Sequence, residues 1–373
     1  MKINKSILIL VAVFASLNVF AQSSINNQTS ISNGESATVK LYVNPNIGND
    51  IFEGSKESPI KSLPEAAKRV SKMTGEGAIS VFLSSGTYGL YETASFNPIH
   101  WKFNKEDRLV IRAEVLPDSL SWAPGKMPII VSTMPFKLSL NEQKEVTDGS
   151  NYGIEINTSH VTIQGLRILG EPIHEKPREG LLIRNYPIVW EGKNLVDLRV
   201  TQCLFLGNKF ALPNHLGILA NGSELTVDHC VFYGVKDAVV MWNNKSDKSS
   251  MHHNLILNIY GAAVWTWSTT EDFKFYNNVV NNANVFWVLE KDAHNTFKIE
   301  KSMLIGYNQF VNKGGGPQEF GIPADKSKLK YSTDFKIKKT GTLNIEEDQT
   351  SRYYLQLKPG TLGTEYGAGL FYK

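Results

Sequence analysis

Four residues in the middle of the chain have side chains suited to binding a carboxylate or transferring protons: Arg184, His215, Lys236 and Tyr260. An arginine fork can hold a carboxylate through two parallel hydrogen bonds. Histidine, lysine or tyrosine can move protons when the surroundings adjust the pKa of the side chain. Elimination from a uronic acid needs such a set, because a cation must neutralise the carboxylate, a base must take the C5 proton and an acid must assist departure from C4. We therefore predict that these four residues are catalytic in a carbon–oxygen lyase. A leaving sugar would make it a polysaccharide lyase, and a leaving chain-end hydroxyl a dehydratase.

A second set of residues has the chemistry of sugar binding. Tryptophan faces stack well on sugar rings, and charged or amide side chains bind carboxylates and hydroxyls. We predict substrate contacts from Arg178, Lys209, Asn221, Asp237, Trp242, Trp265, Trp267 and Glu290. Alternate residues of a strand face opposite sides, so about half of the tryptophans in this region, which include Trp287, are expected in the core.

Two other functions fit the same region. A glycoside hydrolase needs two carboxyl groups about 5 to 9.5 Å apart. Asp237 and Glu290 are the first candidates, with Glu155 and Asp228 in reserve. A non-catalytic glycan-binding protein would keep the tryptophans but lack a converging acid and base. We place elimination first because the basic and aromatic residues are more numerous than the carboxyl groups.

The adjacent histidines His252 and His253 suggest a metal pair. Neighbours on a strand point to opposite faces, so we expect them not to share an ion easily. His229 is expected to stack on His253 in a histidine column. Because no third ligand is evident, we predict no metal and no cofactor.

Two kinds of strand alternate through residues 152–312 and must position these side chains. The first kind begins with GIEIN at 153–157 and the second with VTIQGLRILG at 161–170. Where connections are short, the pattern repeats every 24 residues, as from Cys230 to Asn254. This period fits a solenoid that stacks one coil on the next about 4.8 Å away, so we predict an all-β parallel β-helix. A propeller would need repeats of about 40 residues, and a sandwich would show two-residue hairpin turns.

Equivalent residues of successive coils should stack into ladders. One inward ladder of small or hydrogen-bonding residues is expected to contain Cys203, Cys230, Asn254, Asn278 and Ser302. Such buried polar residues are tolerated when neighbouring rungs satisfy one another. The two cysteines would be adjacent rungs, either joined in a disulfide or stacked as free thiols.

Two segments near the ends of the chain, on either side of the repeats, resemble a known group of proteins. Its opening motif is kept by Tyr42, Val43, Pro45, Gly48, Asp50, Gly54, Pro59, Gly86, Thr87 and Tyr88. With the tail LQLKPGTLGTEYGAGLFYK at 355–373, these residues resemble secreted bacterial right-handed parallel β-helix enzymes of the pectate-lyase-like superfold that act on polysaccharides. Ser55 replaces the usual threonine, and Ile47 lengthens the first turn.

The resemblance covers residues 41–373 and implies a right-handed coil with an acidic polysaccharide or oligosaccharide as substrate, a marine sulfated uronan such as ulvan being one possibility. The substrate would lie along the GIEIN-type strands, between long loops at 171–179 and 208–216. The superfold includes lyases and hydrolases, and fold alone does not fix the reaction. The catalytic motifs and acidic calcium cluster of the best-known lyases are not evident here.

The N-terminus predicts export. Lys2 and Lys5 precede an apolar run at 6–19 and the sequence Phe-Ala-Gln, which is the order of a secretory signal peptide. The run is shorter than the roughly 20 residues of a membrane-spanning helix. We therefore predict a signal peptide at 1–21, a flexible leader at 22–38, a single domain at 39–373, and a periplasmic or secreted protein without membrane insertion.

Composition and local signals complete the prediction. Without Lys2 and Lys5 the chain has 37 basic and 36 acidic residues, a net charge of +1 that does not favour nucleic-acid binding. We expect a monomer. A single helix is predicted at 62–73, where Ser62 and Glu65 form a capping box and Pro64 lies in the first turn.

Overall fold

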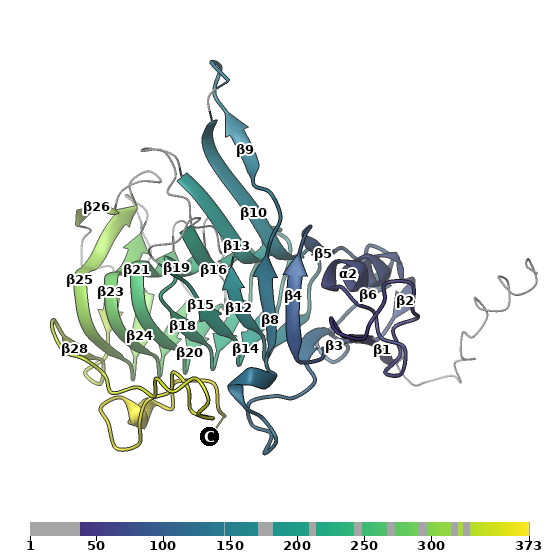
Figure 1. Ribbon diagram of the computed structural model, residues 1–373. Coiled ribbons are helices and arrows are strands. Elements are labelled where there is room, and N and C mark those ends of the chain that lie inside the picture. Colours follow the sequence, from purple (N-terminus) through teal and green to yellow (C-terminus); the bar gives the residue numbers. More distant parts are fainter. Residues whose placement is uncertain are drawn as a thin grey trace, which may run out of the picture. The chain divides into compact units, whose positions relative to one another are not determined.

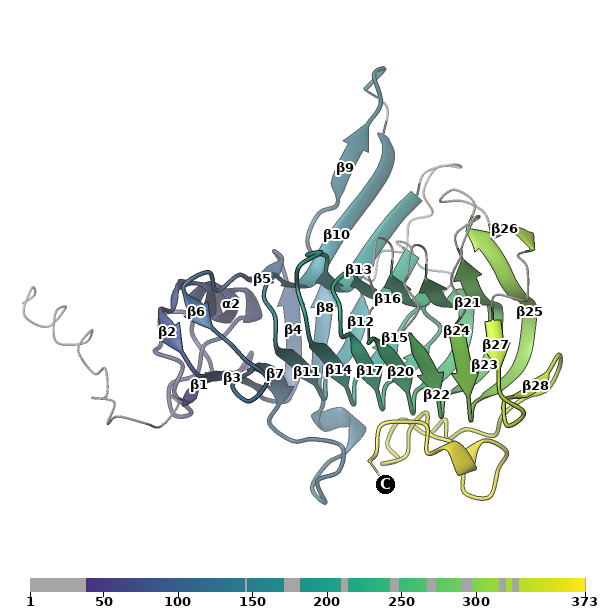
Figure 2. The same ribbon diagram turned by 180° about the vertical axis from the view of Figure 1, so that it is seen from behind.

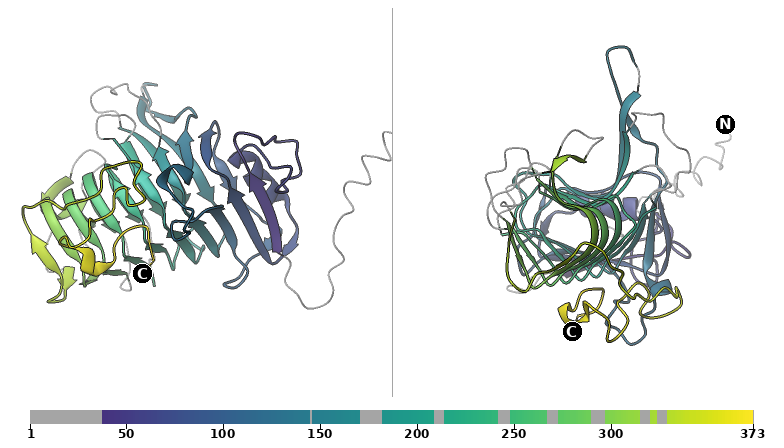
Figure 3. Two further views of the ribbon diagram at one scale, coloured as in Figure 1. Left: turned by 60° about the horizontal axis from the view of Figure 1, so that its bottom comes forward. Right: turned by 90° about the vertical axis from the view of Figure 1, so that its left-hand side faces the viewer.

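The computed structural model describes residues 38–144, 146–170, 182–208, 214–241, 248–266, 273–289, 297–314, 320–323 and 329–372. The predicted signal peptide, nearly all of the leader and much of the two long loops lie outside these residues. The described chain forms a right-handed parallel β-helix, whose nested coils are seen along the axis in Figure 3. The predicted fold class is confirmed.

One face of the coil is a ten-stranded parallel sheet, seen in Figure 2. In the order of pairing, its strands are β1 (Thr38–Val43), β3 (Ala78–Leu83), β7 (Leu109–Ala113), β11 (Val161–Gln164), β14 (Leu198–Thr201), β17 (Thr226–Asp228), β20 (Ser250–His252), β22 (Lys274–Tyr276), β24 (Phe297–Glu300) and β27 (Leu329–Tyr331).

A second sheet bends around the other two faces. One row contains β4 (Gly86–Leu90), β8 (Pro128–Ser132), β12 (Arg167–Gly170), β15 (Leu204–Leu206) and β18 (Val231–Tyr233). The other row contains β5 (Ala94–Phe96), β10 (Val146–Ile156), β13 (Leu182–Trp190), β16 (Asn214–Ala220) and β19 (Asp237–Met241). The long strands β21 (Leu255–Thr266), β23 (Val279–Leu289) and β25 (Met303–Gly314) belong to both rows, since β21 pairs first with β18 and then with β19. The row that contains β10, β13, β16, β19 and the second half of β21 is called the site face, and it includes the GIEIN-type strands.

The remaining elements lie at the ends and edges of these sheets. They are α2 (Leu63–Lys72), β2 (Gly75–Glu76), β6 (Trp101–Lys102), β9 (Lys137–Leu140), β26 (Phe320–Pro323), β28 (Lys336–Lys338) and the short 3-10 turns η1 (Pro124–Lys126) and η3 (Thr364–Tyr366). No helix in the described part of the chain has the length and apolar character needed to span a bilayer.

The helix α2 covers the N-terminal end of the core (Figure 1), where it buries Leu63 and Val70. It begins as predicted, because the Ser62 Oγ accepts a hydrogen bond from the Glu65 N–H at 3.3 Å. The reciprocal half of the capping box is replaced by an ion pair, in which Arg69 Nε donates to Glu65 Oε1 at 2.8 Å.

The inward ladder is present and explains why polar residues are tolerated in the core. Asn254 Nδ2 donates to Asn278 Oδ1 at 2.9 Å, and the same oxygen accepts the Asn254 backbone N–H at 2.9 Å. The Cys230 N–H is bonded in turn to Asn254 Oδ1 at 3.0 Å. Cys203 and Cys230 are buried free thiols rather than a disulfide.

A left-handed residue precedes each rung of the ladder and turns the chain from the first sheet into the second. These residues, called the corner column, are Gly165, Gln202, His229, His253, Asn277 and Lys301, with φ between 39° and 77°. Glycine, asparagine and histidine adopt this conformation more readily than most residues.

The corner column corrects one expectation about the histidines. The strand β20 ends at His252, and His253 has a φ of 54°, so the rule of alternating faces does not apply between them. Their Nδ1 atoms lie 2.9 Å apart, on the same side of the chain.

Two segments lie outside the regular coil. The strands β9 and β10 form an antiparallel hairpin that projects away from the coil (Figure 1) and exposes Leu138 and Leu140. The C-terminal segment, residues 339–372, runs back along the outside of the coil (Figure 2). Its Leu355 and Leu370 are buried against outward residues such as Val231.

Candidate active site

A pocket of about 350 Å³ lies on the site face, above the outward surface of the strands. Its described lining comes from five strands, from the residue after β13 and from the residue before β19. The lining residues are Ser150, Tyr152, Arg184, Tyr186, Glu191, Leu216, Leu219, Lys236, Asp237, Val240 and Trp265. A pocket of this size accommodates part of an oligosaccharide, in a position where polar and apolar side chains converge.

The basic side of the pocket is formed by Arg184 on β13 and Lys236 immediately before β19, both half-buried. Burial lowers the pKa of Lys236, because the charged amine loses hydration, and the positive charge of Arg184 lowers it further. The negative charge of Asp237 opposes these effects without cancelling them. The amine of Lys236 is therefore a stronger candidate for a base than that of an exposed lysine.

Asp237 lies next to Lys236 and is buried, with 3% of its surface exposed. Burial raises the pKa of its carboxyl group, although Lys236 and the hydrogen bond from the Ala262 N–H, 2.7 Å long, work in the other direction. Gly261 makes this packing possible, because a Cβ there would lie against Asp237 Oδ1 and 2.7 Å from the Lys236 carbonyl oxygen. Asp237 thus fixes the bend of β21 as well as lining the pocket.

A tyrosine pair on neighbouring strands also lines the pocket. The rings of Tyr152 and Tyr186 meet edge to face, with centroids 5.7 Å apart. The Tyr152 hydroxyl donates to Glu191 Oε2 at 3.3 Å. Burial and the negative charge of Glu191 raise the pKa of Tyr152 to about 12, so this phenol keeps its proton over the whole physiological range.

The floor of the pocket is apolar. Leu216, Leu219, Val240 and Trp265 belong to one cluster of buried side chains on the outside of the coil, against which Tyr152 packs. Trp265 is 9% exposed. Only a small part of its indole is therefore accessible from the pocket.

The structure brings together four of the predicted site residues: Arg184, Lys236, Asp237 and Trp265. His215 lies on β16 opposite Asn185, one coil above β13, and its side chain is outside the described part of the molecule. The predicted residues outside the described ranges altogether are Arg178, Lys209, Trp242, Trp267 and Glu290.

Two predicted residues lie elsewhere. Asn221 follows β16, is 5% exposed and is not among the described residues that line the pocket. Tyr260 lines a different pocket, of about 660 Å³, where β21 turns from one row of the second sheet into the other. That pocket is lined by stacked asparagines, such as Asn282, whose Nδ2 donates to Asn258 Oδ1 at 2.7 Å. Trp287, considered for the groove or the core, is fully buried in the core.

The reserve carboxylates for hydrolysis are used for other purposes. Glu155 accepts a hydrogen bond from Ser95 Oγ at 2.5 Å. Asp228 lies on the ten-stranded sheet, where Arg199 binds both of its oxygens at 2.8 Å. Glu191 was not predicted, although it is the described carboxylate that shares the pocket with Asp237.

The tyrosine pair was also missed, and a sequence signal for it exists. Tyr152 and Tyr186 each follow an asparagine, and Asn185 Nδ2 donates to Asn151 Oδ1 at 2.6 Å within the core. Alignment of the two Asn-Tyr pairs gives the observed register of β10 and β13. Since side chains alternate along a strand, the buried asparagines direct the tyrosines outward.

Three comparisons place the chain among known proteins. No curated protein matches its sequence. The solved structures similar to it include a GH136 lacto-N-biosidase from Eubacterium ramulus, with 12% identity, a TM-score of 0.42, and coverage of 74% of this chain but 56% of the biosidase. Pectate lyase Pel9A has 12% identity and a TM-score of 0.45, over 88% of this chain and 91% of the lyase.

A further similar structure is a pectate lyase from Bacillus sp. N165 in complex with trigalacturonate. It has 15% identity and a TM-score of 0.45, over 92% of this chain and 94% of the lyase. The family model described as "Right handed beta helix region" matches residues 140–298, which contain most of the coils and the pocket on the site face.

Proposed function

We propose that this chain is a carbohydrate-active enzyme that acts by elimination on a uronic-acid-containing poly- or oligosaccharide. The observation that carries the proposal is the convergence of Arg184, Lys236 and Tyr152 on one pocket of the site face. A cation, a lysine with a lowered pKa and a phenol that stays protonated are the three functions that uronate elimination requires.

The residues divide the reaction as follows. Arg184 binds the uronate carboxylate, which makes the C5 proton more acidic. The neutral Lys236 amine takes that proton, the C5–H electrons form the C4=C5 double bond, and the C4–O bond breaks. The Tyr152 phenol gives its proton to the departing oxygen, and Glu191 accepts a hydrogen bond from that hydroxyl in the resting site.

The apolar floor supports a sugar rather than a freely solvated small anion. Leu216, Leu219 and Trp265 present an apolar surface in the pocket that Arg184, Lys236 and the tyrosine pair also line. The carbon-bound hydrogens of a pyranose ring can rest on such a surface while its carboxylate and hydroxyls reach the polar rim. Export to the periplasm or beyond would place a monomeric enzyme where such polymers occur.

Hydrolysis is the second candidate, because two carboxyl groups share the pocket. Asp237 has a raised pKa, as expected of a general acid, and Glu191 is an exposed carboxyl group that lines the same pocket. Elimination is preferred since the Asp237 carboxylate is engaged by the Ala262 backbone.

Product chemistry tests the proposal. Incubation with fragments of pectin, alginate, glycosaminoglycan and ulvan is expected to produce new ultraviolet absorbance on at least one substrate, because elimination conjugates a C=C bond with the carboxylate. A hydrolase would raise reducing ends without this absorbance. Reducing sugar alone across the panel would reject elimination. The absence of both signals on every substrate would favour a glycan-binding protein.

Replacement of Arg184 by alanine tests the carboxylate contact. A hydrogen bond to a charged group contributes about 1.5 to 3 kcal/mol, so kcat/KM should fall about ten- to hundredfold. Arg184→Lys should recover only part of the loss, because lysine cannot bind the carboxylate through a planar fork. An unchanged kcat/KM in a folded Arg184→Ala protein, judged by circular dichroism, would remove Arg184 from the site.

A further inference from the structure

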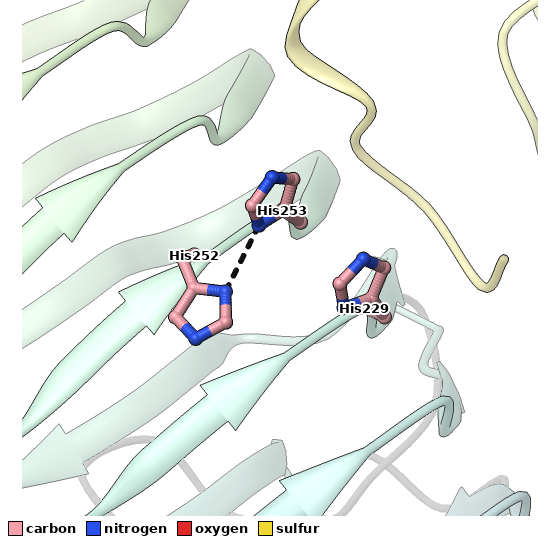
Figure 4. Close-up of side chains that lie close together, drawn as sticks. All are labelled: His229, His252 and His253. Carbon is pink, nitrogen blue, oxygen red and sulfur yellow. Dashed lines mark hydrogen bonds between the residues drawn. The ribbon is translucent and has the colours of Figure 1, made fainter. Parts of the chain in front are cut away.

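Three histidines from two successive coils meet on the side of the molecule that carries the ten-stranded sheet (Figure 4). His252 ends β20, and His229 and His253 are neighbouring rungs of the corner column. One nitrogen from each ring lies within 4.8 Å of the others. The His229 and His253 rings are stacked, with centroids 4.8 Å apart and planes 6° from parallel.

We propose that His229, His252 and His253 form a binding site for a divalent first-row transition ion of the zinc type. Imidazole nitrogens suit Zn²⁺, Cu²⁺, Ni²⁺ and Co²⁺, whereas Ca²⁺ and Mg²⁺ prefer oxygen ligands. The site is separate from the pocket on the site face, and the ion takes no part in the proposed reaction.

The distances fit such an ion after a modest adjustment. The Nδ1 atoms of His252 and His253 are 2.9 Å apart. Two imidazoles bound at about 2.1 Å place their nitrogens about 3.0 to 3.4 Å apart, depending on geometry. The three nitrogens lie within 4.8 Å of one another, so tetrahedral binding requires His229, whose ring is stacked on that of His253, to move closer to the other two by about 1.5 Å.

Neighbouring residues already orient two of the ligands. Asp228 Oδ2 lies 3.0 Å from His229 Nδ1, so the carboxylate accepts the proton on that nitrogen and leaves Nε2 with a lone pair. Arg199 holds the same carboxylate through two hydrogen bonds of 2.8 Å. A carboxylate behind a histidine ligand is the usual arrangement in metal sites, since it fixes the tautomer and the ring orientation.

Asn277, the next rung of the corner column, contacts the ring nitrogen of His253 that faces away from His252. Its Nδ2 lies 3.0 Å from His253 Nε2. Metal binding through His253 Nδ1 requires the proton to move to Nε2. Rotation of the Asn277 amide then presents its Oδ1 as the acceptor, and this rotation changes only which of two similar atoms faces the ring.

The cluster also has space and a route to solvent. His229, His253 and Asn277 line a pocket of about 320 Å³ whose other wall is the C-terminal segment. Tyr372 of that segment lies edge to face with His229, at 4.4 Å between centroids, and the Gly369 N–H donates to the His253 carbonyl at 2.9 Å. A bound ion would therefore tie two coils together directly beneath the C-terminal segment.

The test uses the full, untagged mature chain after chelator treatment and Zn²⁺ alone as the probe. Calorimetric titration should give one site per chain, and Zn²⁺ should raise the Tm because it binds the folded state. Co²⁺ should give the visible absorption of a nitrogen-ligated ion. These readouts are independent of catalysis. The metal-site proposal can therefore be rejected while the proposed function stands, and the proposed function can be rejected while the metal site stands.

The variants are chosen from neighbouring rungs so that the coil is preserved. His229→Gln reproduces Gln202 and His253→Asn reproduces Asn277, both of which adopt the same left-handed backbone. Each should weaken Zn²⁺ binding at least tenfold and reduce the rise in Tm at a fixed Zn²⁺ concentration, while the exposed control His100→Gln keeps the wild-type affinity and the full rise in Tm. Absence of a saturable site in the wild type, or wild-type affinity in His229→Gln, would overturn the proposal.

Discussion

Replacement of Lys236 by methionine is expected to lower kcat on the uronate substrate by about a hundredfold to ten-thousandfold, the range that a general base contributes. Methionine keeps much of the apolar stem of the side chain but cannot accept a proton. In the wild type, kcat/KM should rise with pH as the amine becomes neutral. Because burial lowers the pKa of Lys236 below the ordinary 10.5, this rise should be centred below pH 10.5, and Lys236→Met should lose it.

The matched control for this experiment is Lys298→Met, at an exposed position on β24. It should leave both kcat and the pH profile unchanged. If Lys236→Met retained wild-type turnover with the same ascending limb, another group would be the base. Calorimetric unfolding of both variants separates a catalytic loss from a folding defect.

Replacement of Asn278 by alanine is expected to give the largest loss of stability, because its side chain serves two coils. Its Oδ1 accepts both the backbone N–H and the Nδ2 of Asn254, and its Nδ2 donates to the Met251 carbonyl at 2.8 Å. The side chain is fully buried. The variant removes this partner from two buried backbone groups, the Asn254 N–H and the Met251 carbonyl oxygen, while Asn254 Nδ2 keeps its bond to the Val227 carbonyl. Each buried group left without a partner costs about 1 to 3 kcal/mol, so the free energy of unfolding should fall by about 2 to 6 kcal/mol.

Urea denaturation followed by circular dichroism measures this effect. The control is Asn308→Ala, which removes a bond of similar length, 2.9 Å to Asn284 Oδ1, at an exposed position. Surface changes of this kind usually stay within about 0.5 kcal/mol. Equal midpoints for the two variants would show that the inward ladder contributes no more than a surface contact.

The fold could be predicted because it repeats. A period of 24 residues carries information from every coil, and polar residues that recur at one buried position are expected only where successive coils stack them on one another. The helix was predicted correctly for a different reason, since Ser62 and Pro64 act through local backbone chemistry that needs no tertiary context.

The candidate site was predicted only in part, since the lining of a pocket depends on how irregular strands pair with their neighbours, which the sequence of a single strand does not show. Arg184 was expected on a GIEIN-type strand and Lys236 and Asp237 on a loop that leads into these strands, and the structure brings all three to one pocket. Tyr260 was placed there too, but the strand β21 is irregular between Ile259 and Ala262 and pairs with both rows, which carries Tyr260 to the asparagine pocket. The β9–β10 hairpin was missed because β9 pairs antiparallel with β10, and this pairing is not part of the 24-residue repeat.

The expectation that His252 and His253 point to opposite faces was wrong for a similar cause. The rule that neighbouring side chains point apart holds within a strand, whereas His253 lies one residue beyond the end of β20 in a left-handed conformation. A single dihedral angle outside the strand region therefore reversed the expected relation between His252 and His253.

The corner column has a consequence for how such a protein can acquire new properties. Gly165, Gln202, His229, Asn277 and Lys301 occupy equivalent places with the same backbone conformation, although their side chains differ in size, charge and chemistry. The fold requires a left-handed backbone at these places, while the ladder just inside keeps the coils in register. Evolution can therefore vary a row of functional groups, about 4.8 Å from one coil to the next, without rebuilding the core that supports it.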